Sequence, residues 1–566
     1  MYWVQHRGGK TSTILQIFKI IWISGHSVNW TCPNSFFSIF MFSAVIPKHD
    51  YSCWLTALAL ASGIWYSFII VVQSIGFFQL FRYYSTRPKK ALSPNLKPDE
   101  VPLLTVLRPV QGLDPYLYDC LRASFQQDYP LDKLDIYLCI ASKSDPAMPV
   151  LQRLVTEFPY VNAKIFIEEE DSYLVDQKDG IANTRLGPNP KIRNLSRGYR
   201  EVRGDIVWIL DCNVWTGSDV AGRMVDKLCG YTAKGGKSIP YKFVHQLPLV
   251  INVDCTGVDE RNPGYSLMGA CSNILRRPGH SLQQLFSLNK FGGKLEEMFM
   301  SSSHAKFYTA INTVSVAPCI VGKSNMFRKS HLDYLTAGDL QGLDYFSKSI
   351  CEDHLIGDLI WRQKVVEEVR GQKYHRHGLL FGDLAIQPMA EMSLTKYIAR
   401  RVRWLRVRKW TVPLATMIEP GIEPFFCSMH GAFAITHLPW VSQNLGITQT
   451  WYTFLIVWLI SISVWMLIDA LVYARLHSGA STKITSETPV FARPASKPSL
   501  KKTKSWIVAW LGREILALPI WIWACLCGAT VNWRGRLFRV RIDMTVVEVF
   551  PQNQEAGGNP LYRKIT

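Results

Sequence analysis

Residues 207–217 read VWILDCNVWTG, an apolar run that ends directly in an aspartate. A short continuous run of Val, Ile, Leu and Trp is typical of a buried strand in a parallel sheet. Ligands of open α/β sheets bind at the carboxyl ends of the strands, so this reading places Asp211 at a binding edge. The alternative is that Asp211 caps the following helix or turn, which the stretch alone leaves open.

Working outward from this strand, similar short runs predict the rest of a sheet. The runs are 103–110, 134–141, 163–169 and 205–210, and helix-length or loop-length polar stretches separate them. This alternation predicts a largely parallel α/β sheet. Asp145 follows the second run, so we expect it near Asp211 at the same edge of the sheet.

Hydropathy divides the chain into three parts. Residues 54–81 carry no charge and are long enough to cross a bilayer as a helix. Arg82 and the basic residues at 87–90 follow at once, which places this end in the cytosol. Apolar segments return at 421–440 and 450–474 and predict further membrane helices.

The last hydrophobic segment, 506–530, is interrupted by Arg513 and Glu514. A spanning helix would put the basic stretch 532–541 on the non-cytosolic side, against the positive-inside rule. A re-entrant or interfacial helix is therefore the competing interpretation. The preceding loop, 475–504, carries seven Lys or Arg against one Glu, as a cytosolic loop should.

Composition agrees with a membrane protein that carries a folded soluble part. Of the 566 residues, 48% are hydrophobic and 19% are charged, and the formal net charge is +19. The charge has three candidate sources: cytosolic loops, an anionic membrane surface, or a phosphate-bearing ligand. The 13 cysteines show no zinc-type spacing, which indicates free thiols in a reducing compartment.

Two further motifs precede the C-terminal hydrophobic segments. In CEDHLIGDLIW, residues 351–361, Glu352 and Asp353 are expected in the first turn of a helix, where the helix dipole favours negative charge. In RRVRW, residues 400–404, a basic helix with a Trp is typical of an interfacial anchor.

Taken in order, these motifs resemble the ceramide glucosyltransferases. The resemblance covers about residues 52–545 and rests on SDPA (144–147), NPKIRNL (189–195), LDCNVW (210–215), SSSHAKFY (301–308), VGKSNMFRK (321–329), CEDH (351–354) and RRVRW (400–404). It implies a GT-A, Rossmann-like catalytic domain of the inverting, family 2-related type. Insertions at about 170–188 and 253–300 are similar to the fungal branch of the family.

The resemblance also implies a division into domains. It gives an N-terminal extension (1–51), a transmembrane helix (52–82), a cytosolic GT-A domain (83–415), C-terminal membrane or interfacial helices (416–531) and a C-terminal tail (532–566).

The roles of the site residues follow from the same resemblance. Asp353 matches the catalytic base, and Arg400, Arg403 and Trp404 match the (R/Q)xxRW element. Asp145 matches the acid near the nucleotide, and Asp211 matches the acid next to the metal. The expected donor and acceptor contacts come from Lys191 and Asn194, in a loop near the donor, and from His304, beside the acceptor pocket.

The strand-tip triplet departs from the DxD of processive relatives, because here it reads Asp211, Cys212, Asn213. Only one carboxylate is available, although Asn213 could offer a carbonyl oxygen. We therefore expect a divalent metal, Mg²⁺ or Mn²⁺, bound more weakly than by two carboxylates.

The implied activity is transfer of glucose from UDP-glucose to ceramide, with inversion, in the Golgi or endoplasmic reticulum membrane. Expected partners are the two substrates and the bilayer, without nucleic acid, and the oligomeric state stays open. A processive polysaccharide synthase would share the acids and RxxRW but needs more helices for a polymer channel. A transporter would require ionisable residues at the membrane midplane, of which the sequence offers only Asp469 and the pair at 513–514.

Overall fold

The computed structural model describes residues 48–174, 186–233, 236–253, 288–494, 500–533 and 535–549. Most of the predicted N-terminal extension and large parts of the two predicted insertions lie outside these ranges.

A seven-stranded sheet forms the centre of the α/β domain, with strand order β3-β2-β1-β4-β6-β5-β7. Strands β1, β2, β3 and β4 are mutually parallel, β5 is parallel to β7, and β6 runs antiparallel to both of its neighbours. The order 3-2-1-4 is that of a Rossmann-like half-sheet. The predicted α/β, Rossmann-like fold is therefore confirmed. The strands are β1 (Leu104–Val110), β2 (Leu134–Ile140), β3 (Asn162–Ile167), β4 (Ile206–Leu210), β5 (Phe243–Val253), β6 (Ser324–Arg328) and β7 (Gly378–Ala390).

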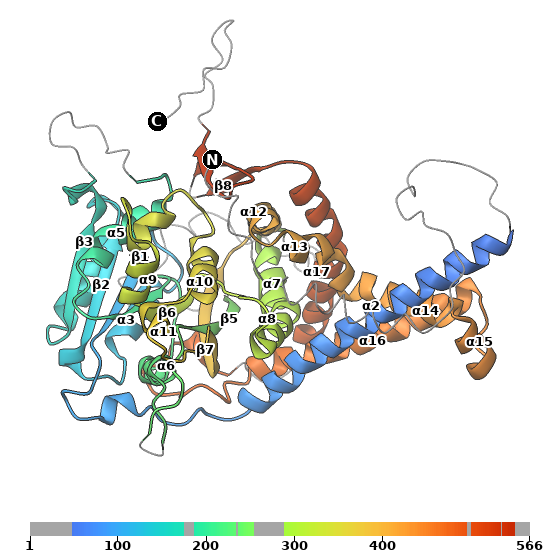
Figure 1. Ribbon diagram of the computed structural model, residues 1–566, viewed down its shortest axis with the longest axis horizontal. Helices are drawn as coiled ribbons and strands as arrows, with labels where there is room; N and C mark the ends of the chain where they lie inside the picture. The colour runs from blue at the N-terminus through green and yellow to red at the C-terminus, as the bar shows by residue number, and fades with distance from the viewer. Residues whose placement is uncertain are drawn as a thin grey trace, which may run out of the picture.

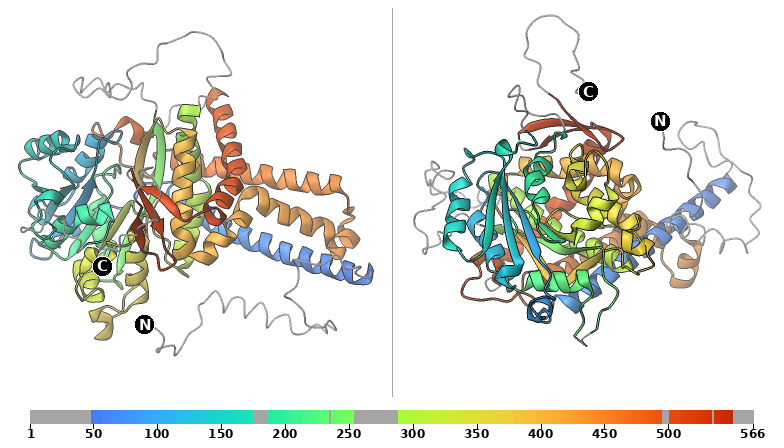
Figure 2. Two further views of the ribbon diagram at one scale, coloured as in Figure 1. Left: turned by 90° about the horizontal axis from the view of Figure 1, so that it is seen from above. Right: turned by 60° about the vertical axis from the view of Figure 1, so that its left-hand side comes forward.

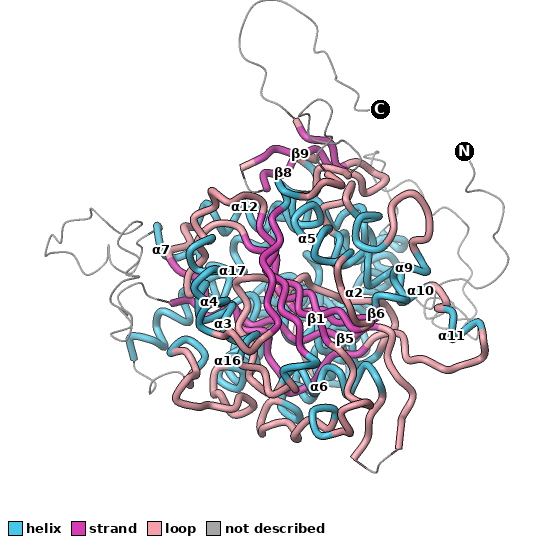
Figure 3. Tube along the Cα trace, turned by 90° about the vertical axis from the view of Figure 1, so that its left-hand side faces the viewer, coloured by secondary structure: helices cyan, strands magenta, loops and turns pink. Residues whose placement is uncertain are grey.

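Helices cover both faces of this sheet, which runs through the middle of the domain (Figure 3). One face packs against α3 (Leu117–Phe125), α4 (Met148–Glu157) and α6 (Val220–Cys229). The other packs against α5 (Pro190–Arg200), α9 (Lys329–Leu335) and α10 (Glu352–Arg362), and the short α11 (Val366–Val369) follows α10. Because both faces are covered, every residue of β1, β2 and β4 is buried, which explains why these strands are mostly apolar.

A bundle of apolar helices projects from the α/β domain (Figure 1). It consists of α2 (Lys48–Tyr83), α14 (Pro424–His437), α15 (Pro439–Leu445) and α16 (Trp451–Leu476). Inside the bundle, the hydroxyl of Ser461 is hydrogen-bonded to those of Tyr66 and Ser428, each at 2.8 Å. Large apolar side chains such as Phe68 and Leu459 point outward and are about half exposed, as a lipid-facing surface requires.

Among the described residues, three helices are long and apolar enough to cross a membrane: Cys53–Tyr83, Trp451–Leu476 and Thr503–Leu526. The predicted apolar segment 421–440 is not one of them. It is divided into a 3₁₀ turn, Glu419–Ile422, and the helices α14 and α15, which Pro439 separates. The 14 residues of α14 extend only about 21 Å at 1.5 Å per residue, less than a hydrocarbon core of about 30 Å.

A further layer of helices lies between the sheet and the bundle. Its members are α7 (Leu288–Ser301), α8 (Ser303–Val314), α12 (Leu394–Thr411), α13 (Pro413–Ile418) and α17 (Leu500–Leu526). Helix α17 packs against α7 and α12 and runs across the base of the bundle (Figure 2, left).

Both flanks of α17 return to the α/β domain. Before it, Glu487 forms an ion pair of 2.8 Å with Arg122 of α3. After it, a small antiparallel sheet follows, β8 (Thr530–Trp533), β9 (Arg536–Val540) and β10 (Val546–Glu548), whose Val546 N–H donates to the carbonyl of Lys348 at 2.8 Å. A helix with both ends on one side of the bundle favours the interfacial interpretation over the spanning one.

Candidate active site

Asp211 stands at the tip of β4, where the buried strand IVWIL ends. Its backbone N–H donates to the carbonyl of Lys323 at 3.1 Å, and its own carbonyl accepts from Val214 at 3.0 Å, so a tight turn follows the strand at once. The Lys323 ammonium lies 3.0 Å from Asp211 Oδ2. Strand, turn and ion pair together fix this carboxylate at the edge of the sheet.

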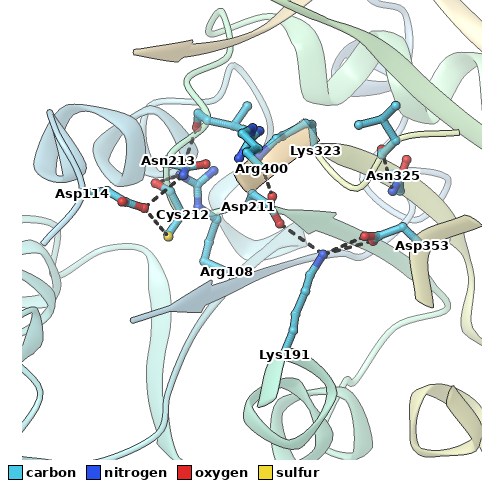
Figure 4. A network of polar contacts seen from close by, with 12 residues as sticks. Arg108, Asp114, Lys191, Asp211, Cys212, Asn213, Lys323, Asn325, Asp353 and Arg400 are labelled. Carbon is cyan, nitrogen blue, oxygen red and sulfur yellow. Dashed lines mark hydrogen bonds and ion pairs between the residues drawn. The ribbon is translucent and has the colours of Figure 1, made fainter. Parts of the chain in front are cut away.

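Lys191 reaches the same carboxylate from the start of α5. Asn189 caps this helix by accepting from the N–H groups of Lys191 at 2.8 Å and Ile192 at 3.2 Å, which holds Lys191 in the first turn. Its Nζ lies 3.2 Å from Asp211 Oδ1 and 3.0 Å from Asp353 Oδ2 (Figure 4). It also lies 3.2 Å from Glu352 Oε1. One ammonium group thus joins three carboxylates from β4 and α10.

The charged side chains of this cluster shift one another's pKa values. Burial would raise the pKa of Asp211, but the ammonium groups of Lys191 and Lys323 outweigh it and lower that pKa to about 2. Burial, together with repulsion by Asp353, raises the pKa of Glu352 to about 8 despite its contact with Lys191. Burial alone would lower the pKa of Lys191, yet the three carboxylates raise it well above its usual value. Asp211 and Lys191 therefore stay charged at neutral pH.

Asp353 occupies the first turn of α10, as the sequence predicts, and faces the pocket. A Cβ atom built on Gly322 would lie 1.8 Å from Asp353 Oδ2, so the backbone of Gly322 packs directly against this carboxylate. The Asp353 side chain keeps 18% of its surface exposed, which leaves it accessible to a ligand. Glycine is required at 322 because any side chain there would displace Asp353.

The ends of β1 and β2 carry a second group of polar side chains. Asp145 accepts from the N–H groups of Gly112 at 3.0 Å and Ala147 at 2.8 Å. Asn194 donates from Nδ2 to the last carbonyl of β1 at 3.0 Å. Asp114 accepts from Asn213 Nδ2 at 3.0 Å (Figure 4). Asp145 and Asn194 thus fix the loop after β1, which reaches over to the Asp211 turn.

The RxxRW motif lies on α12, where it faces α7. Arg400 Nε donates to the fully buried carboxylate of Glu296 at 2.8 Å, and its guanidinium lies 4.6 Å from the ring centre of Trp404. Trp404 packs with Phe299 and its neighbours. Arg403 is on the same helix, one turn beyond Arg400.

His304 lies on α8, against the α7 and α12 side of the site. Its ring is 5.2 Å from that of Tyr308 and 5.6 Å from that of Phe299. Burial, reinforced by the positive charges of Arg401 and Arg408, lowers the pKa of His304 to about 3. Among the described residues, no hydrogen bond or ion pair joins His304 to the Lys191 cluster, so the structure groups it with the RxxRW helix.

The profile of Glycosyl transferase family 21 matches residues 65–235 and 280–546. The chain belongs to this family.

Two relatives illustrate the extent of this similarity. The ceramide glucosyltransferase of Pyricularia oryzae is 49% identical over 510 residues, covering 88% of this chain and 96% of the relative. That of Gibberella zeae is 46% identical over 506 residues, covering 86% and 92%. Among solved structures, a mannosyltransferase from Pyrobaculum calidifontis in complex with GDP-Man and Mn²⁺ matches with a TM-score of 0.36 and 14% identity, covering 74% of this chain and 97% of that one.

The metal-ligand set of this family 21 glycosyltransferase is small. Among the described residues, no group of three or more His, Cys, Asp or Glu could hold a metal ion. The Oδ1 atom of Asn213 is nevertheless buried without a hydrogen-bond partner, two residues after Asp211. An unpartnered oxygen beside a carboxylate that is ionised at neutral pH would suit a hard divalent cation that takes its further oxygen ligands from a bound diphosphate.

Three residues of this candidate site were not among the predicted site residues. Glu352 was assigned only to a helix turn, whereas it contacts Lys191 and accepts from Asn189 Nδ2 at 3.1 Å. Lys323 lies within the motif VGKSNMFRK but had no role of its own, and Asp114 was not considered. Asp114 follows the strand 104–110, so the strand-end rule that selected Asp145 and Asp211 could have found it.

Proposed function

We propose that this family 21 enzyme transfers glucose from UDP-glucose to the primary hydroxyl of ceramide, with inversion at the anomeric carbon. The relatives that carry the name ceramide glucosyltransferase align over most of their length. The single observation that supports the mechanism best is the Lys191 ammonium, within 3.2 Å of Asp211 and of Asp353. It brings a donor-side acid and a candidate base into one pocket.

Asp353 is the proposed general base. Attack by a lipid hydroxyl on the anomeric carbon requires removal of the hydroxyl proton as the new bond forms. Asp353 has an accessible carboxylate at a helix N-terminus, backed by Gly322. Glu352 lies beside it but is only 3% exposed and contacts Asn189 and Lys191, so it serves to position Lys191.

The donor phosphates are proposed to meet the positive side of the pocket. Lys191 and Lys323 flank Asp211, and Arg400 of α12 lies on the same side of the pocket (Figure 4). Arg403, one turn further along α12, is proposed to join them. When UDP leaves, its growing negative charge is stabilised by these cations. An incoming diphosphate competes with Asp353 for Lys191, which frees the carboxylate to accept the hydroxyl proton.

A divalent metal, Mg²⁺ or Mn²⁺, is proposed as a cofactor on the donor side. Asp211 and Asn213 are the residues that would hold it. When bound, such an ion would neutralise diphosphate charge and act as a Lewis acid for the leaving group. Asp145 and Asn194, which fix the loop after β1, are proposed to shape the nucleotide site.

The acceptor is proposed to enter from the membrane side. Ceramide keeps its two chains in the bilayer, so its hydroxyl must meet the enzyme at the interface. Trp404 and His304 lie on that side, among the helices between the sheet and the bundle. This arrangement fits a cytosolic catalytic domain, residues 83–415, on a Golgi or endoplasmic reticulum membrane.

The product of purified enzyme tests this function. Detergent-solubilised protein is given UDP-[¹⁴C]glucose and a short-chain ceramide, and the lipid extract is analysed by chromatography and by NMR of the anomeric proton. We expect one β-linked glucosyl lipid. A labelled polymer would indicate a polysaccharide synthase, and transfer to diacylglycerol instead of ceramide would contradict the acceptor assignment.

A further inference from the structure

Arg108 lies near the carboxyl end of β1 and is completely buried. Its Nη2 donates to three backbone carbonyls, those of Cys120 at 2.7 Å, Val214 at 3.1 Å and Cys212 at 3.2 Å. Burial of a charged side chain costs free energy, and these hydrogen bonds offset part of that cost. Because Cys212 and Val214 are the two neighbours of Asn213, the guanidinium fixes the backbone on both sides of Asn213.

The loop after β1 is anchored as well. Gly112 adopts a φ of +66°, a conformation that favours glycine, and its N–H donates to Asp145 at 3.0 Å. Two residues later, the carbonyl of Asp114 accepts from the N–H of Leu117, the first residue of α3, at 3.1 Å. The backbone of Asp114 is therefore fixed, so its carboxylate has a defined position beside the Asp211 turn.

The Asp114 carboxylate contacts two side chains of this turn. Its Oδ2 accepts from Nδ2 of Asn213 at 3.0 Å and from the thiol of Cys212 at 3.6 Å (Figure 4). An ionised carboxylate only accepts hydrogen bonds, so the nitrogen of the Asn213 amide has to face it. The opposite orientation would bring two acceptor oxygens together. Asp114 thus determines the direction in which Asn213 Oδ1 points.

This oxygen is the unsatisfied atom of the turn. Among the described residues, Asn213 Oδ1 is buried without a hydrogen-bond partner. Arg108 fixes the backbone and Asp114 binds the amide nitrogen, so the side chain has little freedom to pair the oxygen elsewhere. An unpaired buried acceptor destabilises a protein unless a ligand completes it. A divalent cation beside Asp211, two residues earlier, would supply the missing contact.

We propose that Asp114 is a positioning residue for the metal site, which orients the amide of Asn213 so that Oδ1 is available to a divalent cation at Asp211. The inference rests on the proposed function, which supplies the cation and the UDP diphosphate. Asp114 acts through Asn213, because its Oδ2 already accepts from Asn213 and Cys212. A turn with one carboxylate thereby gains a second oxygen ligand whose direction is fixed.

UDP binding to the full-length enzyme in detergent tests this role without a measurement of glucosyl transfer. Binding of [¹⁴C]UDP is measured by equilibrium dialysis in EDTA and at increasing Mn²⁺ concentrations. The Mn²⁺ midpoint, the concentration that gives half of the increase in UDP binding, reports the affinity for the ion. Binding in EDTA reports on the rest of the pocket and should stay within about twofold of wild type in every variant at position 114.

Asp114→Asn and Asp114→Leu have similar size but differ in hydrogen bonding. The amide oxygen in Asp114→Asn still accepts from Asn213 Nδ2, so we expect its Mn²⁺ midpoint within about threefold of wild type. Asp114→Leu has no acceptor and should raise the midpoint about tenfold, a typical effect of removing the hydrogen-bond partner of a metal ligand. Asp132→Asn removes an exposed carboxylate and should leave the midpoint unchanged. Equal losses in Asp114→Asn and Asp114→Leu would overturn the proposal, because the charge rather than the acceptor would then matter.

A double-mutant cycle shows whether Asp114 acts through Asn213. Asn213→Ala should raise the Mn²⁺ midpoint about tenfold. Adding Asp114→Leu to this variant should change the midpoint by less than about twofold, because the side chain that Asp114 orients is already absent. Independent effects that multiply would overturn the proposal. If Asp114→Leu does not fold, Asp114→Ala removes the same acceptor without apolar bulk and takes its place in the cycle.

The outcomes separate this inference from the proposed function. A wild type that forms no glucosylceramide would refute the function itself. An active wild type whose UDP binding does not respond to Mn²⁺ would refute the metal site, and the role of Asp114 with it. An active wild type that responds to Mn²⁺, with the midpoint unchanged in Asp114→Leu, would refute only the role of Asp114.

Discussion

The Nζ atom of Lys191 lies 3.0 Å from Oδ2 of Asp353, the proposed base. The same nitrogen contacts Asp211 and Glu352, so three carboxylates share one buried ammonium group. Without this cation the carboxylates would face one another in a pocket with little solvent. Lys191 therefore stabilises the pocket before substrate binds and contributes to the chemistry afterwards.

Replacing Lys191 by Met should reveal both roles. We expect activity to fall at least about a hundredfold and the free energy of unfolding to fall by about 3 kcal/mol, the cost of leaving buried charge unpaired. Because the pKa of Glu352 is already raised to about 8, it rises further without Lys191, and the folded variant binds extra protons. The stability deficit should therefore shrink as the pH falls from about 10 toward 8 and change little below 8, where Glu352 is protonated in both folded proteins.

Thermal unfolding of the purified variant across this pH range measures the effect. Lys143→Met is the control, because Lys143 pairs with Glu170 at the surface. A deficit that is the same at every pH would contradict the shared-ammonium account.

Removal of the divalent metal should lower the activity of the enzyme. Recovery of activity when metal is added back should require Asp211. Incubation with EDTA is expected to lower kcat/KM for UDP-glucose, and added Mg²⁺ or Mn²⁺ should restore it. Asp211→Asn should lose at least about a hundredfold, and added metal should not rescue it. Full activity in saturating EDTA would show instead that Lys191 and Lys323 neutralise the diphosphate alone.

We expect the C-terminal strands, β8 to β10, to position Asp353, the proposed general base. Phe538 of β9 is fully buried and belongs to the cluster against which Ile350 and Cys351 pack, next to Asp353. Phe538→Ala should cost about 3 kcal/mol of stability and lower kcat without changing UDP affinity. Ile542→Ala, at a position that is 76% exposed, should leave both unchanged. Equal kcat in the two variants would exclude this positioning role.

His304 should remain neutral wherever the enzyme works. Burial lowers its pKa from 6.5 to about 3, so only the unfolded chain takes up its proton as the pH falls below 6.5. The contribution of His304 to the free energy of unfolding is therefore fully present above pH 6.5. It decreases as the pH falls, by up to about 2 kcal/mol at pH 5. His304→Asn should show a smaller loss of unfolding free energy between pH 7 and pH 5 than the wild type. Parallel pH profiles would contradict the neutral assignment.

The sequence predicts the parallel half of the sheet well. Strands β1, β2 and β4 are buried along their whole length and are mostly apolar, and the partly exposed β3 still ends in the apolar residues IFI. Asp145 and Asp211 were placed correctly at strand ends by the same logic. Strands β5, β6 and β7 were not predicted. They contain the buried polar residues His245, Asn325 and Asp383; the partners of His245 and Asp383 lie on the distant helices α8 and α6.

Long-range contacts account for the remaining differences. Lys191 contacts three acids, of which Asp353 is more than 150 residues away in the sequence. No local sequence pattern encodes such contacts. The course of α17 depends on the return of β8 to β10 to the α/β domain, whereas its hydropathy alone satisfies the criteria for a span. The sequence pattern predicts where helices and strands lie along the chain. Tertiary contacts determine on which side of the bundle the two ends of a helix such as α17 lie.

The central claim is that Asp353 removes the acceptor proton in a pocket that already binds the donor. Its most direct test is single-turnover glucosyl transfer from UDP-[¹⁴C]glucose to short-chain ceramide by Asp353→Asn, measured beside UDP binding and beside Glu352→Gln. We expect Asp353→Asn to bind UDP within about threefold of wild type and to transfer glucose at least about a thousandfold more slowly, with a smaller loss in Glu352→Gln. Transfer by Asp353→Asn at a rate near that of wild type would contradict the account.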